Sequence, residues 1–141
     1  MINNIRFDLA HIDLINTKIA YPSIDWLKAN CYTSFELGEE AKTYVADGRI
    51  LFACGMKYIS EGVGSCWVVP SIYVDNYAKS FFKEMKESLD IYSKKMGLHR
   101  IQTCIDEKFV KWIEMLGFKR ESVLEKINID KTDQYLYVKF Y

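Results

Sequence analysis

A long amphipathic helix between two apolar strands is the feature that most constrains the fold of this 141-residue chain. Over residues 76–96, apolar side chains recur every three or four positions, which predicts a helix with one buried stripe that ends at Gly97. The apolar runs at residues 65–69 and 99–105 predict strands, the first of them buried on both faces. Two strands joined through a helix run parallel, so the sequence predicts a parallel crossover.

Turn residues and alternating apolar positions locate the remaining strands. Asp47-Gly48 predicts a type I′ hairpin turn, because this turn needs positive φ and glycine reaches it without a Cβ clash. The other expected strands cover residues 4–9, 42–46, 50–59, 119–128 and 134–141. Apart from the crossover, neighbouring strands are expected to be antiparallel.

Helix signals complete the order of elements. Residues 10–32 predict two short helices, one on each side of Pro22. Asp75 or Asn76 is the expected N-cap of the long helix, and Asp106 is the expected N-cap of a short helix after the crossover strand.

The predicted order is therefore β-α-α-β-β-β-α-β-α-β-β. It describes one α/β (α+β) domain over residues 1–141, with a mixed, mainly antiparallel sheet and helices on both faces.

Charge and hydropathy narrow the classes of function. Lysine plus arginine equals aspartate plus glutamate, 19 against 19, so the chain lacks the global positive field of a nucleic-acid-binding protein. No apolar run approaches the roughly 20 residues that span a bilayer. The N-terminus has no secretory apolar region. We expect a cytoplasmic protein with neither a nucleic-acid nor a membrane partner.

The cysteine pattern does not predict a metal site. Four cysteines stand far apart in the sequence: Cys31, Cys54, Cys66 and Cys104. Neither His11 nor His99 lies at a ligand spacing from any of them. The last three cysteines sit inside apolar strand-like runs, so we expect buried, reduced and unreactive thiols.

The order of elements resembles that of the Gcn5-related N-acetyltransferase (GNAT) superfamily. The most specific local match is residues 111–121, a helix that ends in a Leu-Gly-Phe step into a strand. Residues 123–126 and 135–138 resemble the closing hairpin of that fold. The resemblance extends over residues 42–141 and is weak before them. It implies an N-acetyltransferase that uses acetyl-CoA as co-substrate and a small-molecule or protein amine as acceptor.

One branch of the superfamily resembles the chain more closely. Residues 66–71, Cys-Trp-Val-Val-Pro-Ser, and residues 109–117 resemble a divergent GNAT-like group of short-tailed bacteriophages. This resemblance implies a phage-encoded protein in the host cytoplasm or the virion. A homodimer or a virion protein partner is expected with it.

The resemblance also implies the positions of the acyl-CoA contacts. In the family, pantetheine binds the backbone of the fourth strand and pyrophosphate binds the start of the following helix. The residues at those positions, together with the one that starts the next helix, are Trp67, Val68, Val69, Ser71, Asn76, Lys79 and Asp106. The turn at residues 70–76 departs from the family pattern, because it has no glycine and no positive charge and includes Asp75.

The catalytic residues are less closely defined. Many GNAT enzymes place a tyrosine acid where Ile113 stands here, and isoleucine has no proton to donate. Acidic residues near the fourth strand often serve as the base in the family, so the resemblance implies Glu61 as the base, and Tyr73 is the predicted substitute for the missing acid. The sequence leaves other candidates open for these roles: Glu36, His99 and Tyr137.

Three functional hypotheses follow. The first is an acetyl-CoA-dependent N-acetyltransferase. The second is a catalytically inactive GNAT-like protein that binds another protein through aromatic side chains and has lost the glycine loop. The third is a binding module for another acyl or nucleotide compound. Fold alone does not choose among them.

Overall fold

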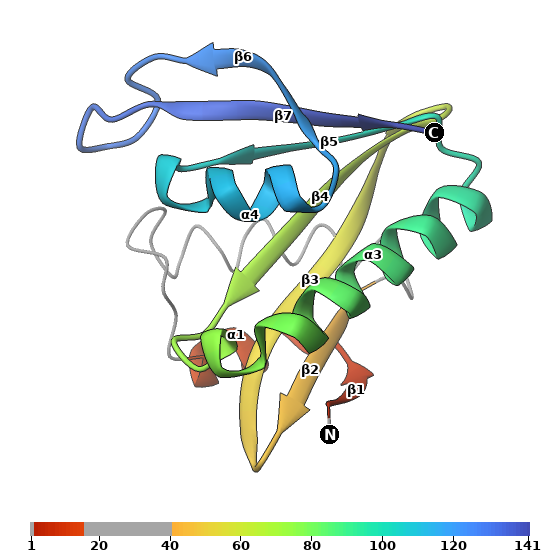
Figure 1. Ribbon diagram of the computed structural model, residues 1–141, viewed down its shortest axis with the longest axis vertical. Coiled ribbons are helices and arrows are strands. Elements are labelled where there is room, and N and C mark those ends of the chain that lie inside the picture. Colours follow the sequence, from red (N-terminus) through yellow and green to blue (C-terminus); the bar gives the residue numbers. More distant parts are fainter. Residues whose placement is uncertain (1, 16–40) are drawn as a thin grey trace. The chain divides into compact units, whose positions relative to one another are not determined.

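The computed structural model describes residues 2–15 and 41–141 of the chain. Over these residues the elements are β1 (Asn3–Arg6), α1 (Ala10–Leu14), β2 (Lys42–Ala46), β3 (Arg49–Ser60), β4 (Val63–Pro70), the 3₁₀ helix η1 (Val74–Tyr77), α3 (Ala78–Lys95), β5 (Arg100–Ile105), the 3₁₀ helix η2 (Glu107–Phe109), α4 (Val110–Met115), β6 (Lys119–Leu124) and β7 (Gln134–Phe140) (Figure 1). The predicted order is confirmed for this part of the chain. The second predicted helix near Pro22, together with Cys31 and Glu36, lies outside the described residues.

The described strands form one seven-stranded sheet in the order β1-β2-β3-β4-β5-β7-β6. β4 and β5 pair in parallel, which confirms the predicted crossover. The pairs β1–β2, β2–β3, β5–β7 and β6–β7 are antiparallel. Asp47 and Gly48 have φ values of 51° and 72°, as the predicted hairpin turn requires.

The chain divides into two compact units. Unit 1 consists of Met1–Lys57 and Cys66–Glu84, and unit 2 consists of Tyr58–Ser65 and Met85–Tyr141. β4 and α3 each begin in one unit and end in the other.

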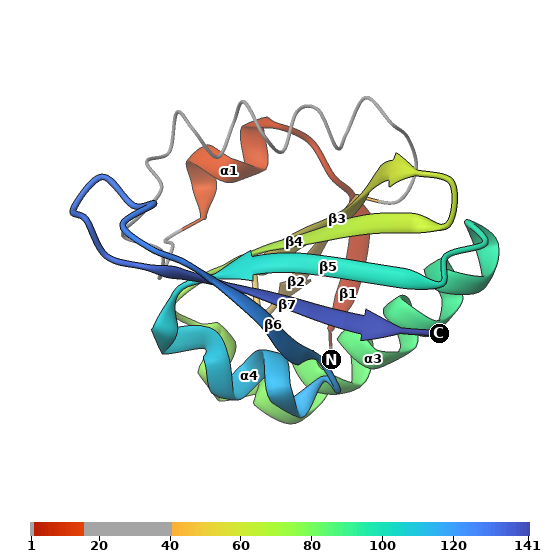
Figure 2. The same ribbon diagram turned by 90° about the horizontal axis from the view of Figure 1, so that it is seen from above.

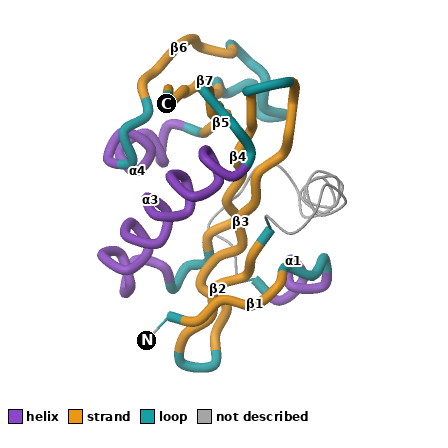
Figure 3. Tube along the Cα trace, turned by 90° about the vertical axis from the view of Figure 1, so that its right-hand side faces the viewer, coloured by secondary structure: helices purple, strands orange, loops and turns teal. Residues whose placement is uncertain are grey.

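The core of unit 1 lies on both faces of β3, whose successive side chains point in opposite directions. Phe52 stacks on Tyr44 at a centroid distance of 4.4 Å and meets the edge of Phe81 from α3 at 4.8 Å. Ala53, on the other face, belongs to a buried cluster with Phe7 and Ile12. α1 therefore covers one face of these strands and the first turns of α3 cover the other (Figure 2). Figure 3 shows β1, β2 and β3 side by side in this unit.

A buried hydrogen bond fastens α1 to β2. The hydroxyl of Thr43, which is fully buried, lies 2.8 Å from His11 Nδ1. The same nitrogen accepts the Asp8 N–H at 3.1 Å and therefore carries no hydrogen, so Thr43 is the donor. His11 thus satisfies a polar group inside the core.

We expect His11→Ala to lower the free energy of unfolding by about 1–3 kcal/mol, because it leaves a buried hydroxyl without an acceptor. Denaturant unfolding measures this change. His11→Asn, which keeps an acceptor close to Nδ1, should cost less. Adding Thr43→Val to His11→Ala should recover part of the loss, and no recovery would contradict this explanation.

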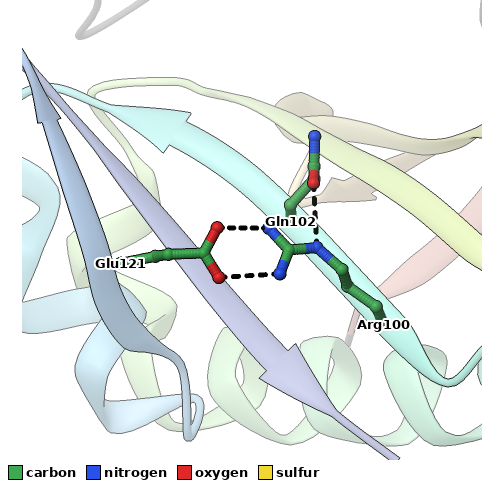
Figure 4. Close-up of polar contacts among 3 residues, drawn as sticks. All are labelled: Arg100, Gln102 and Glu121. Carbon is green, nitrogen blue, oxygen red and sulfur yellow. Dashed lines mark hydrogen bonds and ion pairs between the residues drawn. The ribbon is translucent and has the colours of Figure 1, made fainter.

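Unit 2 packs α4 against the strands β5, β7 and β6. Ile113 of α4 is buried, as are Leu116 and Phe118 just after the end of that helix, and Tyr137 of β7 is fully buried. On the surface, Arg100 of β5 binds Glu121 of β6 through two hydrogen bonds of 2.7 and 2.6 Å. The pair spans β7, which lies between those strands (Figure 4). The hydrogen bond from Arg100 lowers the pKa of the Glu121 carboxyl.

Two predictions about burial are wrong. Residues 66–68 of β4 are half-buried rather than buried on both faces. An apolar run does not reveal where a neighbouring strand stops pairing, and the ladder with β5 stops at Ser65. Cys104 is exposed, because it points away from the face of β5 on which Ile101 and Thr103 are buried.

Candidate active site

The parallel ladder between β4 and β5 is short. It runs over three residue pairs, from Val63–Arg100 to Ser65–Gln102, and ends there. Trp67, Val68 and Val69 follow along β4 beyond the end of this ladder. Backbone N–H and C=O groups outside a ladder need other hydrogen-bonding partners, and an extended ligand can supply them.

Ser71 organises the turn after β4. Its side chain is fully buried, and its N–H donates to the Leu51 carbonyl at 2.8 Å. Its Oγ accepts the Tyr73 N–H at 3.2 Å, and its carbonyl accepts the Val74 N–H at 3.3 Å. Ser71 therefore shapes the turn and directs no free donor to the surface.

The predicted caps of the long helix are corrected by the structure. Because Ser71 starts the turn early, η1 precedes α3, and Asp75 and Asn76 lie inside η1 instead of capping α3. Tyr73 occupies the N-cap position of η1 and makes no side-chain capping bond. Asn76 and Lys79 are exposed at the start of the helical segment.

A cation that sequence reasoning missed lies on this turn. The guanidinium carbon of Arg49, at the start of β3, is 4.5 Å from the centroid of the Tyr73 ring. The neighbouring Asp47 accepts a hydrogen bond from the Tyr77 hydroxyl, which raises the pKa of Tyr77, while Arg49 lowers it. The only sequence signal was the turn at Asp47-Gly48, which places Arg49 first in the returning strand.

The two predicted catalytic residues fall in different units. Tyr73 is half-buried in unit 1, on the same segment as Trp67. Glu61 is exposed in unit 2, in the turn before Val63. Val63 and Trp67 are four residues apart, which is about 13 Å along an extended strand. Glu61 therefore comes before the end of β4 that pairs with β5, whereas Trp67 comes after the last residue of that ladder.

Tyr137, the alternative candidate for the acid, already forms hydrogen bonds with its hydroxyl within unit 2. Its hydroxyl donates to Glu114 Oε1 at 2.9 Å and accepts from Arg120 Nε at 3.3 Å. Burial raises the pKa of Tyr137, the Glu114 hydrogen bond raises it further, and Arg120 lowers it. Its proton is held by Glu114 inside the protein, so Tyr137 is poorly placed to protonate a ligand.

Asp106 anchors a loop. It stands at the N-cap position of η2 with extended backbone but makes no side-chain capping bond, which corrects the predicted cap. Its Oδ1 accepts a hydrogen bond from Asn128 Nδ2 at 2.9 Å. The side chain thereby ties the end of β5 to the loop between β6 and β7.

Sequence comparison and fold comparison give different results. No protein-family model and no curated protein matches the sequence. Ard1 from Thermoplasma volcanium matches with a TM-score of 0.78 at 9% identity, over 99% of this chain and 97% of that chain. A GNAT-family acetyltransferase from Bacillus anthracis matches with a TM-score of 0.69 at 14% identity, over 99% and 94%. The NatC complex bound to Gag peptide and CoA matches with a TM-score of 0.74 at 14% identity, over 99% and 98%.

The chain has the GNAT fold. In this fold, the segments predicted to contact acyl-CoA, residues 67–69 and 70–79, all belong to unit 1. Glu61 and Asp106 belong to unit 2. The assigned roles of all these residues stay predictions.

Two further findings describe the GNAT-fold chain. Within residues 2–15 and 41–141, no three or more histidine, cysteine, aspartate or glutamate side chains are grouped so as to hold a metal ion. None of the described helices combines the length and apolar character needed to cross a membrane.

Proposed function

We propose that the chain is an acyl-CoA-dependent N-acetyltransferase whose acceptor is a small-molecule or protein amine. Its support is the GNAT fold over nearly the whole chain, shared with an acetyltransferase and with a CoA-bound NatC complex. The observation that carries the proposal is the short β4–β5 ladder, which leaves the backbone at residues 67–69 beyond its end.

The proposed roles follow from the positions of the side chains. Acetyl-CoA would supply a thioester whose acetyl group passes to the amine nitrogen, with release of the CoA thiol. The backbone of residues 67–69 would hold pantetheine, and Asn76 and Lys79 would lie near the phosphates. Tyr73 is the favoured acid, because the Tyr137 hydroxyl already donates to Glu114. Glu61 remains the proposed base and Asp106 a proposed contact.

Acetyl-CoA should stabilise the folded chain. At 100 times its Kd, a ligand that binds only the native state adds about 2.7 kcal/mol to the free energy of unfolding. Thermal unfolding with and without acetyl-CoA measures this gain, and calorimetry gives the Kd. A panel of amines, assayed for release of the CoA thiol, then tests transfer. The absence of any shift at millimolar acetyl-CoA would contradict the proposal.

A non-catalytic GNAT-fold protein is the second candidate. It is favoured by the turn at residues 70–76, which has no glycine and whose Ser71 is fully buried. Ile113, which stands at the family's acid position and has no proton to donate, also favours a non-catalytic protein. This candidate predicts a partner protein or a homodimer and no turnover of acetyl-CoA with any amine. A phage origin and a place in the virion stay predictions from resemblance alone, and the cytoplasmic location stays a prediction from the sequence.

A further inference from the structure

The turn of the proposed acyl-CoA site has no cation of its own. Residues 70–76 contain neither lysine nor arginine, and Asp75 is exposed among them. CoA carries a pyrophosphate and a 3′-phosphate, so its binding needs positive charge close to these groups. Lys79 is exposed in the first turn of α3, but its long side chain is flexible.

Another segment of unit 1 brings a guanidinium to the same turn. Arg49 Cζ lies 4.5 Å from the centroid of the Tyr73 ring. The Tyr73 N–H is fixed by Ser71 Oγ at 3.2 Å, and the Ser71 N–H is fixed by the Leu51 carbonyl at 2.8 Å. Leu51 and Arg49 both belong to β3, so the ring and the guanidinium that covers it are held by one strand.

The charges around Arg49 leave it available to an anion. The nearby carboxylate, Asp47, accepts a hydrogen bond from the Tyr77 hydroxyl. No carboxylate in the described part of the chain forms an ion pair with Arg49. A guanidinium that lies over an aromatic ring still has its N–H donors in one plane, from which they can bind a phosphate in a bidentate manner.

From these contacts we infer that Arg49 is a phosphate-binding residue of the proposed acyl-CoA site. It supplies from the β2–β3 hairpin the positive charge that residues 70–76 lack. The inference rests on the proposed function. The contact with the Tyr73 ring restricts the Arg49 side chain before the ligand arrives, which lowers the entropy cost of binding.

Calorimetric titration of the full chain with three ligands tests the inference. We expect Arg49→Gln to bind CoA about tenfold more weakly and to bind pantetheine, which has no phosphate, unchanged. A tenfold loss that persists with 3′-dephospho-CoA assigns Arg49 to the pyrophosphate. A loss that is confined to CoA assigns it to the 3′-phosphate. Added salt should reduce the difference in CoA affinity between Arg49→Gln and the unchanged chain, because it screens the charge of Arg49.

Lys57→Gln is the matched control. Lys57 lies eight residues along β3 from Arg49, roughly 27 Å in an extended strand, and its loss removes the same charge. We expect its CoA affinity to be unchanged. We also expect Arg49→Gln to unfold at nearly the temperature of the unchanged chain, because Arg49 is exposed.

The outcomes separate this inference from the proposed function. If Arg49→Gln binds CoA as tightly as the unchanged chain, the inference is wrong and the acetyltransferase proposal stands. Equal losses for CoA and pantetheine also overturn it, since a phosphate contact cannot affect a ligand without phosphate. If the unchanged chain does not bind CoA, the proposed function is wrong and the inference falls with it.

Discussion

Replacement of Gly55 by alanine should lower the free energy of unfolding by about 2–3 kcal/mol, within the range for overpacking of a core. Gly55 is buried in β3 beneath the indole ring of Trp67. A Cβ at this position would lie 2.6 Å from Trp67 Nε1 and 2.7 Å from two ring carbons. Denaturant unfolding of the two proteins measures the difference.

The indole ring has little freedom to move away from a new methyl group. The indole also contacts Phe7 in a T-shaped arrangement, with ring centroids 5.3 Å apart, and Phe7 is fully buried. Trp67 Nε1 is buried without a hydrogen-bond partner among the described residues, so a tilt of the ring breaks no hydrogen bond there but changes its packing against Phe7.

A double-mutant cycle provides the control for Gly55→Ala. Phenylalanine at position 67 lacks Nε1, so Gly55→Ala should cost at least about 1 kcal/mol less in Trp67→Phe than in the unchanged chain. Equal costs in both backgrounds would show that the clash with the indole is not the cause. Because Trp67 lies on the proposed pantetheine strand, Gly55→Ala should also weaken binding of acetyl-CoA.

Strong alkali should destabilise the fold through Cys54. Burial, followed by smaller effects of Cys66 and Glu84, raises the pKa of this thiol from 9.0 to about 12. Above pH 9 the unfolded chain loses the proton while the native chain keeps it, so the native state binds more protons. Stability contributed by the protonated thiol is therefore complete below pH 9 and is lost progressively between pH 9 and 12. At pH 11 the loss is about 2–3 kcal/mol.

Cys54→Ala isolates this contribution. The variant loses some packing at every pH, but its free energy of unfolding should fall less steeply between pH 9 and 12 than that of the unchanged chain. Other groups titrate in both proteins, including Tyr137, whose pKa is also raised, so the difference between the two curves is the measured quantity. Parallel curves would show that Cys54 ionises in the native state as readily as in the unfolded state.

Local patterns were sufficient to predict the order of elements. The helical periodicity of residues 76–96 between two apolar runs led to the parallel crossover, because few topologies connect such elements. Asp47 and Gly48 do adopt positive φ, and Gly97, at φ 63°, lies just after the end of α3. These features depend on residues close together in the sequence.

Features that depend on distant residues were not predictable. The contact of Arg49 with Tyr73 joins residues 24 positions apart, and no local pattern encodes it. The partners of Tyr137 lie 17 and 23 positions away. The half-buried state of residues 66–68 depends on where the β4–β5 ladder ends, which hydrophobicity does not encode. For the same reason the sequence identified the segment that would hold acyl-CoA better than the side chains that would act there.

The tip of the β2–β3 hairpin has a practical consequence for anyone who adds a label or a reporter domain to this protein. A short exposed Asp-Gly turn is ordinarily a safe insertion point. Here Asp47 accepts a hydrogen bond from Tyr77 and Arg49 lies over the Tyr73 ring, so an insertion would disturb η1 and the turn before it. A tag at this tip should therefore disturb a segment more than 20 residues away in the sequence.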